Sequence, residues 1–233
     1  MRTRVGRLTL VLAVAAGLGA SCATKLVAPP ASETAPVANS PANAVRVLEH
    51  AVNTRDVDAI DGLLTDDLQF VSAGTDSSGN PTREAWTRDT FFAALRAMLV
   101  GSAERPPAEQ VTLLFDQHVV PFPDGRPGKD PKWHKQIRTS LDLKVRIDAG
   151  NSVEVTGNAL FFLTRGDSAQ IPPDLIARGL RPDSTRWWMG RMEDETLAGS
   201  GQRSPMSTPK STHPSMNVTL GQVLSLWRPA AWP

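Results

Sequence analysis

Hydrophobic and polar residues follow two different periods along this chain, and the change of period divides its ordered part in two. From residue 41 to about residue 100, apolar residues recur at three- and four-residue spacing, which is typical of helices packed on a core. From residue 111 to residue 195 they alternate with polar residues, as in half-buried strands. The pattern therefore predicts an α+β domain, with helices first and antiparallel strands afterwards.

Three helices are predicted in the first half. One spans residues 41–52 and has Ser40 as its N-cap. A short one spans residues 57–64. A longer one spans residues 83–100 and has a broad apolar stripe formed by Trp86, Phe91, Phe92, Leu95, Met98 and Leu99. Between these two, residues 68–71 are interpreted as a first strand.

The second half is read as strands because its apolar residues alternate over long stretches. Residues 111–119 form one predicted strand. Residues 140–148 and 153–163 form two more, and the turn at residues 149–151 makes them a hairpin. A last strand is predicted at residues 186–195.

This order of elements resembles the nuclear-transport-factor-2-like superfamily, which includes the SnoaL-like and ketosteroid-isomerase-like proteins. The resemblance is carried by residues 44–48 and 56–60, followed by residues 63–70, and it rests on patterning rather than on an invariant motif. It covers about residues 42–195. It implies that the N-terminal helices pack on a strongly bent, cone-like antiparallel sheet whose mouth is a pocket. Residues 220–228 are interpreted as a short added C-terminal helix.

The N-terminus has the parts of a secretory signal. Three arginines lie within the first seven residues, an apolar run follows at residues 8–18, and small residues at 19–21 precede Cys22, the only cysteine of the chain. A Cys in this place resembles a lipobox, which implies cleavage before Cys22 and lipidation of its thiol and amino group. A secretory signal with an unmodified Cys is the alternative.

The domain organisation follows from these segments. We expect a signal peptide at residues 1–21, then lipidated Cys22 and a Pro- and Ala-rich disordered tether over residues 22–41. The α+β domain spans residues 42–228, with loop insertions at 166–184 and 197–214. Ala23, directly after the Cys, favours an outer-membrane anchor facing the periplasm. The membrane is thus one predicted partner.

Charge excludes one class of partner. Three of the 25 basic residues lie in the leader, which leaves 22 against 24 acidic residues, a net charge of about −2. Since nucleic-acid binding needs a basic surface, we expect none.

Candidate catalytic residues are few. Ketosteroid-isomerase-like members use a carboxylate base with a Tyr-centred oxyanion site, and this chain has no Tyr. Dehydratase-like members use a His and Asp pair, which His118 with Asp116 or Asp142 would supply here. Asp116 and His118 would share one face of the strand at 111–119. Alternatively, these residues lie on the solvated face of a half-open sheet.

No metal or cofactor site is predicted. The four histidines form no close pair and no helical His-x-x-x-His motif, and no glycine-rich phosphate loop follows a strand. Trp187 and Trp188 point to opposite faces of one strand, so one ring is predicted to lie in the core and the other to line a pocket with His118 or a partner surface. Alternatively, both rings pack in the core under an adjacent loop. The acidic run at 193–195 is interpreted as a solvated strand end.

Three hypotheses about function follow. The first is a non-catalytic envelope lipoprotein whose domain binds a small apolar ligand or a protein partner. The second is a lyase or isomerase that uses His118 and a nearby carboxylate in the cone. The third is a homodimeric scaffold, because this superfamily often pairs through its open sheet face. The sequence does not decide the ligand, the openness of the cone or the oligomeric state.

Overall fold

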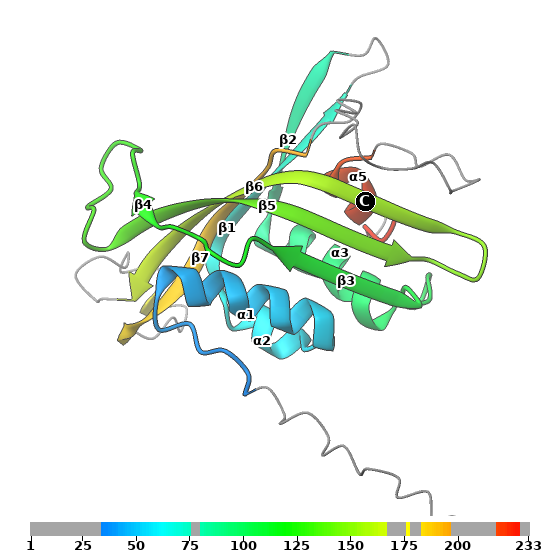
Figure 1. Cartoon of the computed structure of the whole chain (residues 1–233), viewed down its shortest axis with the longest axis horizontal. Coiled ribbons are helices and arrows are strands. Elements are labelled where there is room, and N and C mark those ends of the chain that lie inside the picture. The colour runs from blue at the N-terminus through cyan, green and yellow to red at the C-terminus, as the bar shows by residue number, and fades with distance from the viewer. Residues whose placement is uncertain (1–33, 76–79, 167–175, 178–182, 197–217, 229–233) are drawn as a thin grey trace, which may run out of the picture. The chain divides into compact units, whose positions relative to one another are not determined.

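The structure is a computed structural model that describes residues 34–75, 80–166, 176–177, 183–196 and 218–228 (Figure 1). The chain divides into two units, Met1–Thr34 and Ala35–Pro233, and all the elements described below belong to the second. The predicted signal peptide, Cys22 and most of the predicted tether lie outside the described residues. So do most of the predicted insertion at 166–184 and all of the one at 197–214. The part of the tether that is described includes Ala38, which is buried and accepts a backbone hydrogen bond from Trp187 (2.8 Å).

Two helices open the domain, as predicted. Helix α1 spans Pro41–Thr54, and Ser40 caps it by accepting a hydrogen bond from the backbone N–H of Asn43. Helix α2 spans only Val57–Asp61, which is shorter than predicted, because the following residues enter a strand. At the end of α1, Arg55 adopts a left-handed conformation, and its guanidinium binds the carbonyl oxygens of Leu99 and Ala108.

The sheet has seven strands, which are β1 (Leu64–Thr75), β2 (Pro81–Thr87), β3 (Gln110–Phe115), β4 (Phe122–Pro123), β5 (His134–Arg146), β6 (Ser152–Gly166) and β7 (Asp183–Asp194). Their order is β2-β1-β7-β6-β5-β3, with β4 paired to β5, and the sheet is not closed. Figure 1 shows β5 and β6 as long curved strands above α1 and α2. All pairs are antiparallel except β1 with β7, which is parallel, so the prediction of a purely antiparallel sheet was wrong at this pair.

The hairpin of β5 and β6 confirms the strongest strand prediction. Its register runs without a break from His134↔Thr164 to Arg146↔Ser152. The side chains of Ile137, Leu141 and Leu143 on β5 are buried, while Arg138 and Ser140 between them are exposed. One face of the hairpin therefore packs on the core and the other faces outward.

The predicted helix at 83–100 begins later than expected. Helix α3 spans Arg88–Val100 with Thr87 as its N-cap, and the residues before it form β2, paired with β1 through Phe70↔Trp86. Trp86 therefore lies on a strand and not on the predicted helix, where its separation of five positions from Phe91 would turn it about 140° away from that residue. Pairing with β1 decides between the two, and no pattern within residues 83–87 reveals that partner.

The core lies between the inner face of the sheet and the helices. Helix α1 packs on β3, β5 and β7, and α3 packs on β1 and β2. Phe70 is fully buried, with its ring centre 5.3 Å from that of Trp86 and 4.8 Å from that of Phe91. Phe115 and Phe161 form an edge-to-face pair at 5.3 Å on the same core. These aromatic contacts join β1, β2 and α3 on one side, and β3 and β6 on the other.

A short C-terminal helix completes the domain, as predicted. Helix α5 spans Leu220–Ser225 and lies on β1 and α3. Figure 1 shows it in red, close to α3. Thr219 and Gln222 form a reciprocal capping box at its N-terminus.

Candidate functional site

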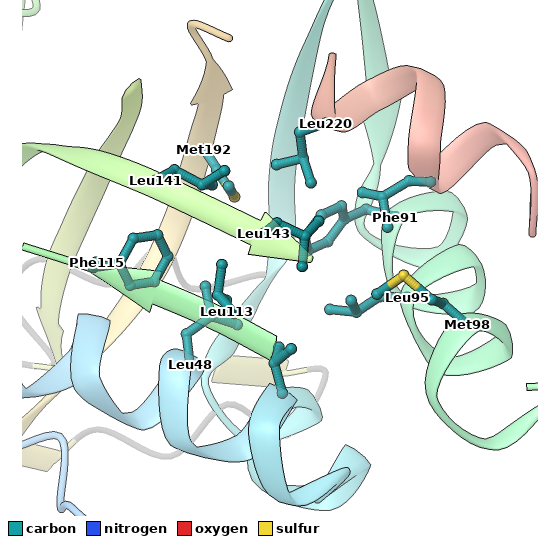
Figure 2. A pocket seen from close by; sticks show the side chains of 12 residues that line it. Leu48, Phe91, Leu95, Met98, Leu113, Phe115, Leu141, Leu143, Met192 and Leu220 are labelled. Atoms are coloured by element: carbon teal, nitrogen blue, oxygen red, sulfur yellow. The ribbon is translucent and has the colours of Figure 1, made fainter. Parts of the chain in front are cut away.

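An apolar cavity lies inside the domain between the sheet and the helices (Figure 2). Its volume is about 30 Å³. Six elements line it, and every lining side chain is hydrophobic. The lining residues are Leu48 and Val52 on α1, Phe91, Leu95 and Met98 on α3, Leu113 and Phe115 on β3, Leu141 and Leu143 on β5, Met192 on β7, and Leu220 and Leu224 on α5.

The two sequence periods place these side chains on a common interior. On the helices the lining residues are separated by three or four positions, as for Leu48 and Val52, so they share one helix face. On the strands they are two positions apart, as for Leu113 and Phe115, so they share one sheet face. Figure 2 shows the strand and helix side chains converging on the same space.

The lining limits the chemistry of this cavity. It contains no acid, base, hydroxyl or amide side chain, so none of its residues can transfer a proton or act as a nucleophile. A site of this kind favours hydrocarbon groups, because a polar group would lose its hydrogen bonds to water on entering.

A buried carboxylate holds the N-terminus of α5 in place. Asp194 is 2 % exposed and accepts hydrogen bonds from the backbone N–H groups of Thr196 and Gly221, each at 2.9 Å. It also accepts one from the Thr196 hydroxyl, whose oxygen in turn accepts from the backbone N–H of Leu220 (2.9 Å). The interpretation of residues 193–195 as a solvated strand end was therefore wrong at Asp194.

Two contacts after α5 hold its other end. The Trp227 indole N–H donates to the Pro106 carbonyl at 3.2 Å, and the Trp227 side chain is buried. Arg228 pairs with Glu84 at 2.7 Å and stacks over the Trp86 ring. The hydrogen bond from Arg228 lowers the pKa of the Glu84 carboxyl, so this carboxyl stays charged in neutral solution.

Two glycines allow segments of the chain to approach each other closely, one between α5 and β1 and the other between β6 and Thr196. A Cβ atom on Gly221 would lie 1.6 Å from the Ser72 Oγ and 2.6 Å from the Ser72 Cβ, so only glycine fits between α5 and β1. A Cβ atom on Gly157 of β6 would lie 2.8 Å from the Cα of Thr196. Neither glycine was identified from the sequence, because its close neighbour is distant along the chain.

The predicted catalytic residues are not brought together. Strand β3 ends at Phe115, so Asp116 and His118 follow the strand, and both are exposed. The Asp116 carboxylate accepts hydrogen bonds from the Ser140 hydroxyl (2.6 Å) and backbone N–H (3.0 Å), which lower its pKa. Asp142 lies on the outer face of β5 and is 3.7 Å from the Lys144 Nζ. None of the three residues lines the cavity.

The two predicted pocket tryptophans lie apart from the cavity too. Trp187 belongs to the hydrophobic core. Trp188 is buried on the other face, where its ring covers Gly166 and the Arg186 guanidinium stacks on it at 5.4 Å. Neither ring lines the cavity, whose strand wall on β7 is Met192 instead.

The part of the chain that the structure describes contains no group of three or more His, Cys, Asp or Glu side chains placed to hold a metal ion. Of its histidines, His134 is buried, and this burial lowers its pKa. Its Nδ1 lies 3.2 Å from the Asp130 carbonyl oxygen. His50 lies on α1, half-buried and outside the cavity lining. In the same described residues, no helix has the length and hydrophobicity to cross a membrane.

Comparison with known proteins gives similarity only among solved structures. No protein-family model matches the chain, and no curated protein matches it. Among similar structures is a conserved protein from Planctomyces limnophilus, with 17% identity, 67% of this chain and 92% of that chain covered, and a TM-score of 0.42. A candidate scytalone dehydratase from Novosphingobium aromaticivorans has 10% identity and a TM-score of 0.44, and the alignment covers 66% of this chain and 81% of that chain. A nuclear-transport-factor-2-like protein of unknown function in nutrient uptake from Rhodospirillum rubrum has 16% identity and a TM-score of 0.41. The alignment covers 68% of this chain and 98% of that chain.

Proposed function

We propose that this chain is an envelope-anchored lipoprotein whose cone-like domain binds a small apolar ligand without catalysing a reaction. The observation that carries the proposal is the lining of the cavity, which consists of twelve hydrophobic side chains from six elements. An apolar lining that gathers side chains from six elements around a space of about 30 Å³ suits a small hydrocarbon group better than a protein surface, because a protein partner needs a broad exposed patch.

A lyase or isomerase that uses His118 has less support. A general base must come within hydrogen-bond reach of the proton that it removes. His118 is exposed beyond the end of β3. The Asp116 carboxylate accepts hydrogen bonds from the backbone N–H and the hydroxyl of Ser140. A substrate in the cavity would therefore meet no acid or base among the described side chains that line it.

Toluene tests the binding proposal, because it is uncharged and small. The protein for this test is the mature chain carrying Cys22→Ala, which needs no detergent that would compete for an apolar site. Toluene should shift the methyl NMR signals of the cavity residues Leu113, Leu143 and Met98, and leave the methyl signals of Leu160 on the outer face unchanged. It should also raise the melting temperature with concentration.

Two matched substitutions control this test. Leu113→Phe places a ring in the cavity and should abolish the toluene-dependent shifts. Leu160→Phe adds the same bulk on the opposite face of the sheet and should leave them in place, because Leu160 alternates with the core residues Ala159 and Phe161. Shifts that survive Leu113→Phe would show binding elsewhere and would contradict the proposal.

The anchor is a separate part of the proposal and has its own test. It is supported by the basic, apolar and small residues that precede Cys22. In cell fractionation, the full-length chain should sediment with membranes, and Cys22→Ala should release it to the soluble envelope fraction, because a lipid anchor supplies the membrane affinity. A Cys22→Ala variant that stays with the membranes would refute lipid anchoring.

A further inference from the structure

Helix α5 forms one part of the cavity wall. Its residues Leu220 and Leu224 line the cavity, and Figure 2 shows the Leu220 side chain directed toward Phe91 and Leu143. We propose that α5 is a displaceable plug, and that Leu220 and Leu224 occupy the place that the hydrocarbon group of a ligand takes. This inference rests on the proposed function, since it concerns the same cavity.

The size of the cavity supports displacement. With both leucines in place, the space is about 30 Å³, which is enough for water but far below the roughly 300–1,000 Å³ typical of ligand pockets. The remaining walls belong to the sheet and to α1 and α3, which have 14 and 13 residues. Helix α5 has six residues, so it is the wall that moves with the fewest changes elsewhere.

The contacts that hold α5 in place also support its movement away from the cavity. Strands of the sheet are joined to their neighbours by backbone hydrogen-bond ladders, whereas α5 is joined to the sheet through side chains. Its N-terminal backbone groups bind Asp194 and Thr196, and Arg228 after it pairs with Glu84. Water can replace these polar contacts when the helix leaves, and a ligand can replace the apolar contacts of Leu220 and Leu224.

The lining defines the class of ligand. Leu220 and Leu224 each end in an isobutyl group, and the ten other lining residues present only hydrocarbon or thioether atoms. The site therefore takes a branched aliphatic or single-ring aromatic group without charge. A charged part of the same ligand would have to stay outside, because nothing in the lining could pair with it.

Displacement has a quantitative consequence for affinity. If a ligand binds only molecules whose plug is out, the apparent dissociation constant equals the intrinsic one divided by the fraction of such molecules. A substitution that unseats α5 without touching the cavity walls should therefore tighten binding. Gly221 provides this substitution, because its Cβ would collide with Ser72.

The experiment compares three forms of the mature Cys22→Ala chain, which differ only at the contact between α5 and β1. Gly221→Ala should unseat α5, while alanine itself favours the helical state of these residues over glycine. The double variant Ser72→Gly/Gly221→Ala should reseat it, because the atom then nearest to the new Cβ is the Cα of residue 72, at 3.4 Å. Toluene titrations followed by methyl NMR give the dissociation constant of each form.

We expect Gly221→Ala to bind toluene about tenfold more tightly than the parent, and the double variant to return to the parent value. Without ligand, the Leu220 and Leu224 methyl signals of Gly221→Ala should move to positions typical of exposed leucines. Saturating toluene should produce the same movement in the parent. Thr196→Val, which removes the hydroxyl that binds the Leu220 N–H, should tighten binding by a smaller factor and serves if Gly221→Ala does not fold.

Two results would overturn the inference, and they are distinguishable. Equal toluene affinity in the parent, Gly221→Ala and Thr196→Val would refute the plug and leave the proposed apolar site in place. Absence of binding in all of these forms would refute the apolar site itself, and the plug with it.

Discussion

Replacing Phe70 with alanine is expected to lower the free energy of unfolding by about 3–5 kcal/mol, which is the usual cost of removing a fully buried aromatic ring. Phe70 has no exposed surface, and its ring contacts Trp86 and Phe91. The substitution therefore removes burial and two aromatic contacts, and it leaves a cavity where β1, β2 and α3 meet.

Urea unfolding followed by circular dichroism measures this loss. Phe122→Ala is the matched control, because Phe122 is 57% exposed on β4 and should change stability by no more than about 0.5 kcal/mol. If Phe70→Ala cost as little as the control, the packing of α3 on β1 would be wrong.

The same region shows why the sequence predicted only part of the fold. The β5–β6 hairpin was predicted because apolar and polar residues alternate over residues 140–148 and 153–163, on both sides of the turn at 149–151. Residues 83–87 were assigned to a helix because Trp86 was counted in the apolar stripe that continues through Phe91, although five helical positions would turn these two side chains about 140° apart. Their strand conformation depends on pairing with β1, a neighbour that precedes them by a loop and that local patterning does not define.

The candidate site shows a similar division. Apolar periodicity placed Phe91, Leu95 and Met98 on the core face of a helix, and the structure places all three on the cavity. Whether such a face is filled or hollow depends on how six elements pack together, and a pattern along one chain does not contain that information. Polar residues were misleading for a related reason, because an alternating strand places them on its outer face regardless of function.

Asp194 was assigned to solvent because it lies in an acidic run, and its burial results from a partner 27 residues away. Its neighbours Glu193 and Glu195 are half-buried and form ion pairs with Arg83 and Arg138, so the prediction of a solvated strand end does not hold for them either. A sequence signal for the burial of Asp194 does exist, since Thr196 follows at the spacing of an Asx turn, but that motif does not reveal the backbone of α5 above it.

Asp194→Ala is therefore expected to lower the free energy of unfolding by about 3 kcal/mol or more, because it leaves several buried donors without their acceptor at roughly 1–3 kcal/mol each. These donors are the backbone N–H groups of Gly221 and Thr196 and the Thr196 hydroxyl. Asp194→Asn keeps one carboxamide oxygen as an acceptor and should cost less than Asp194→Ala. Urea unfolding gives the two values, and methyl NMR of Leu220 and Leu224 shows whether α5 has left its seat. Loss of stability with both leucines still buried would mean that Asp194 supports the strand end alone. Exposure of both leucines would show that this one carboxylate links the last strand of the sheet to the closure of the cavity.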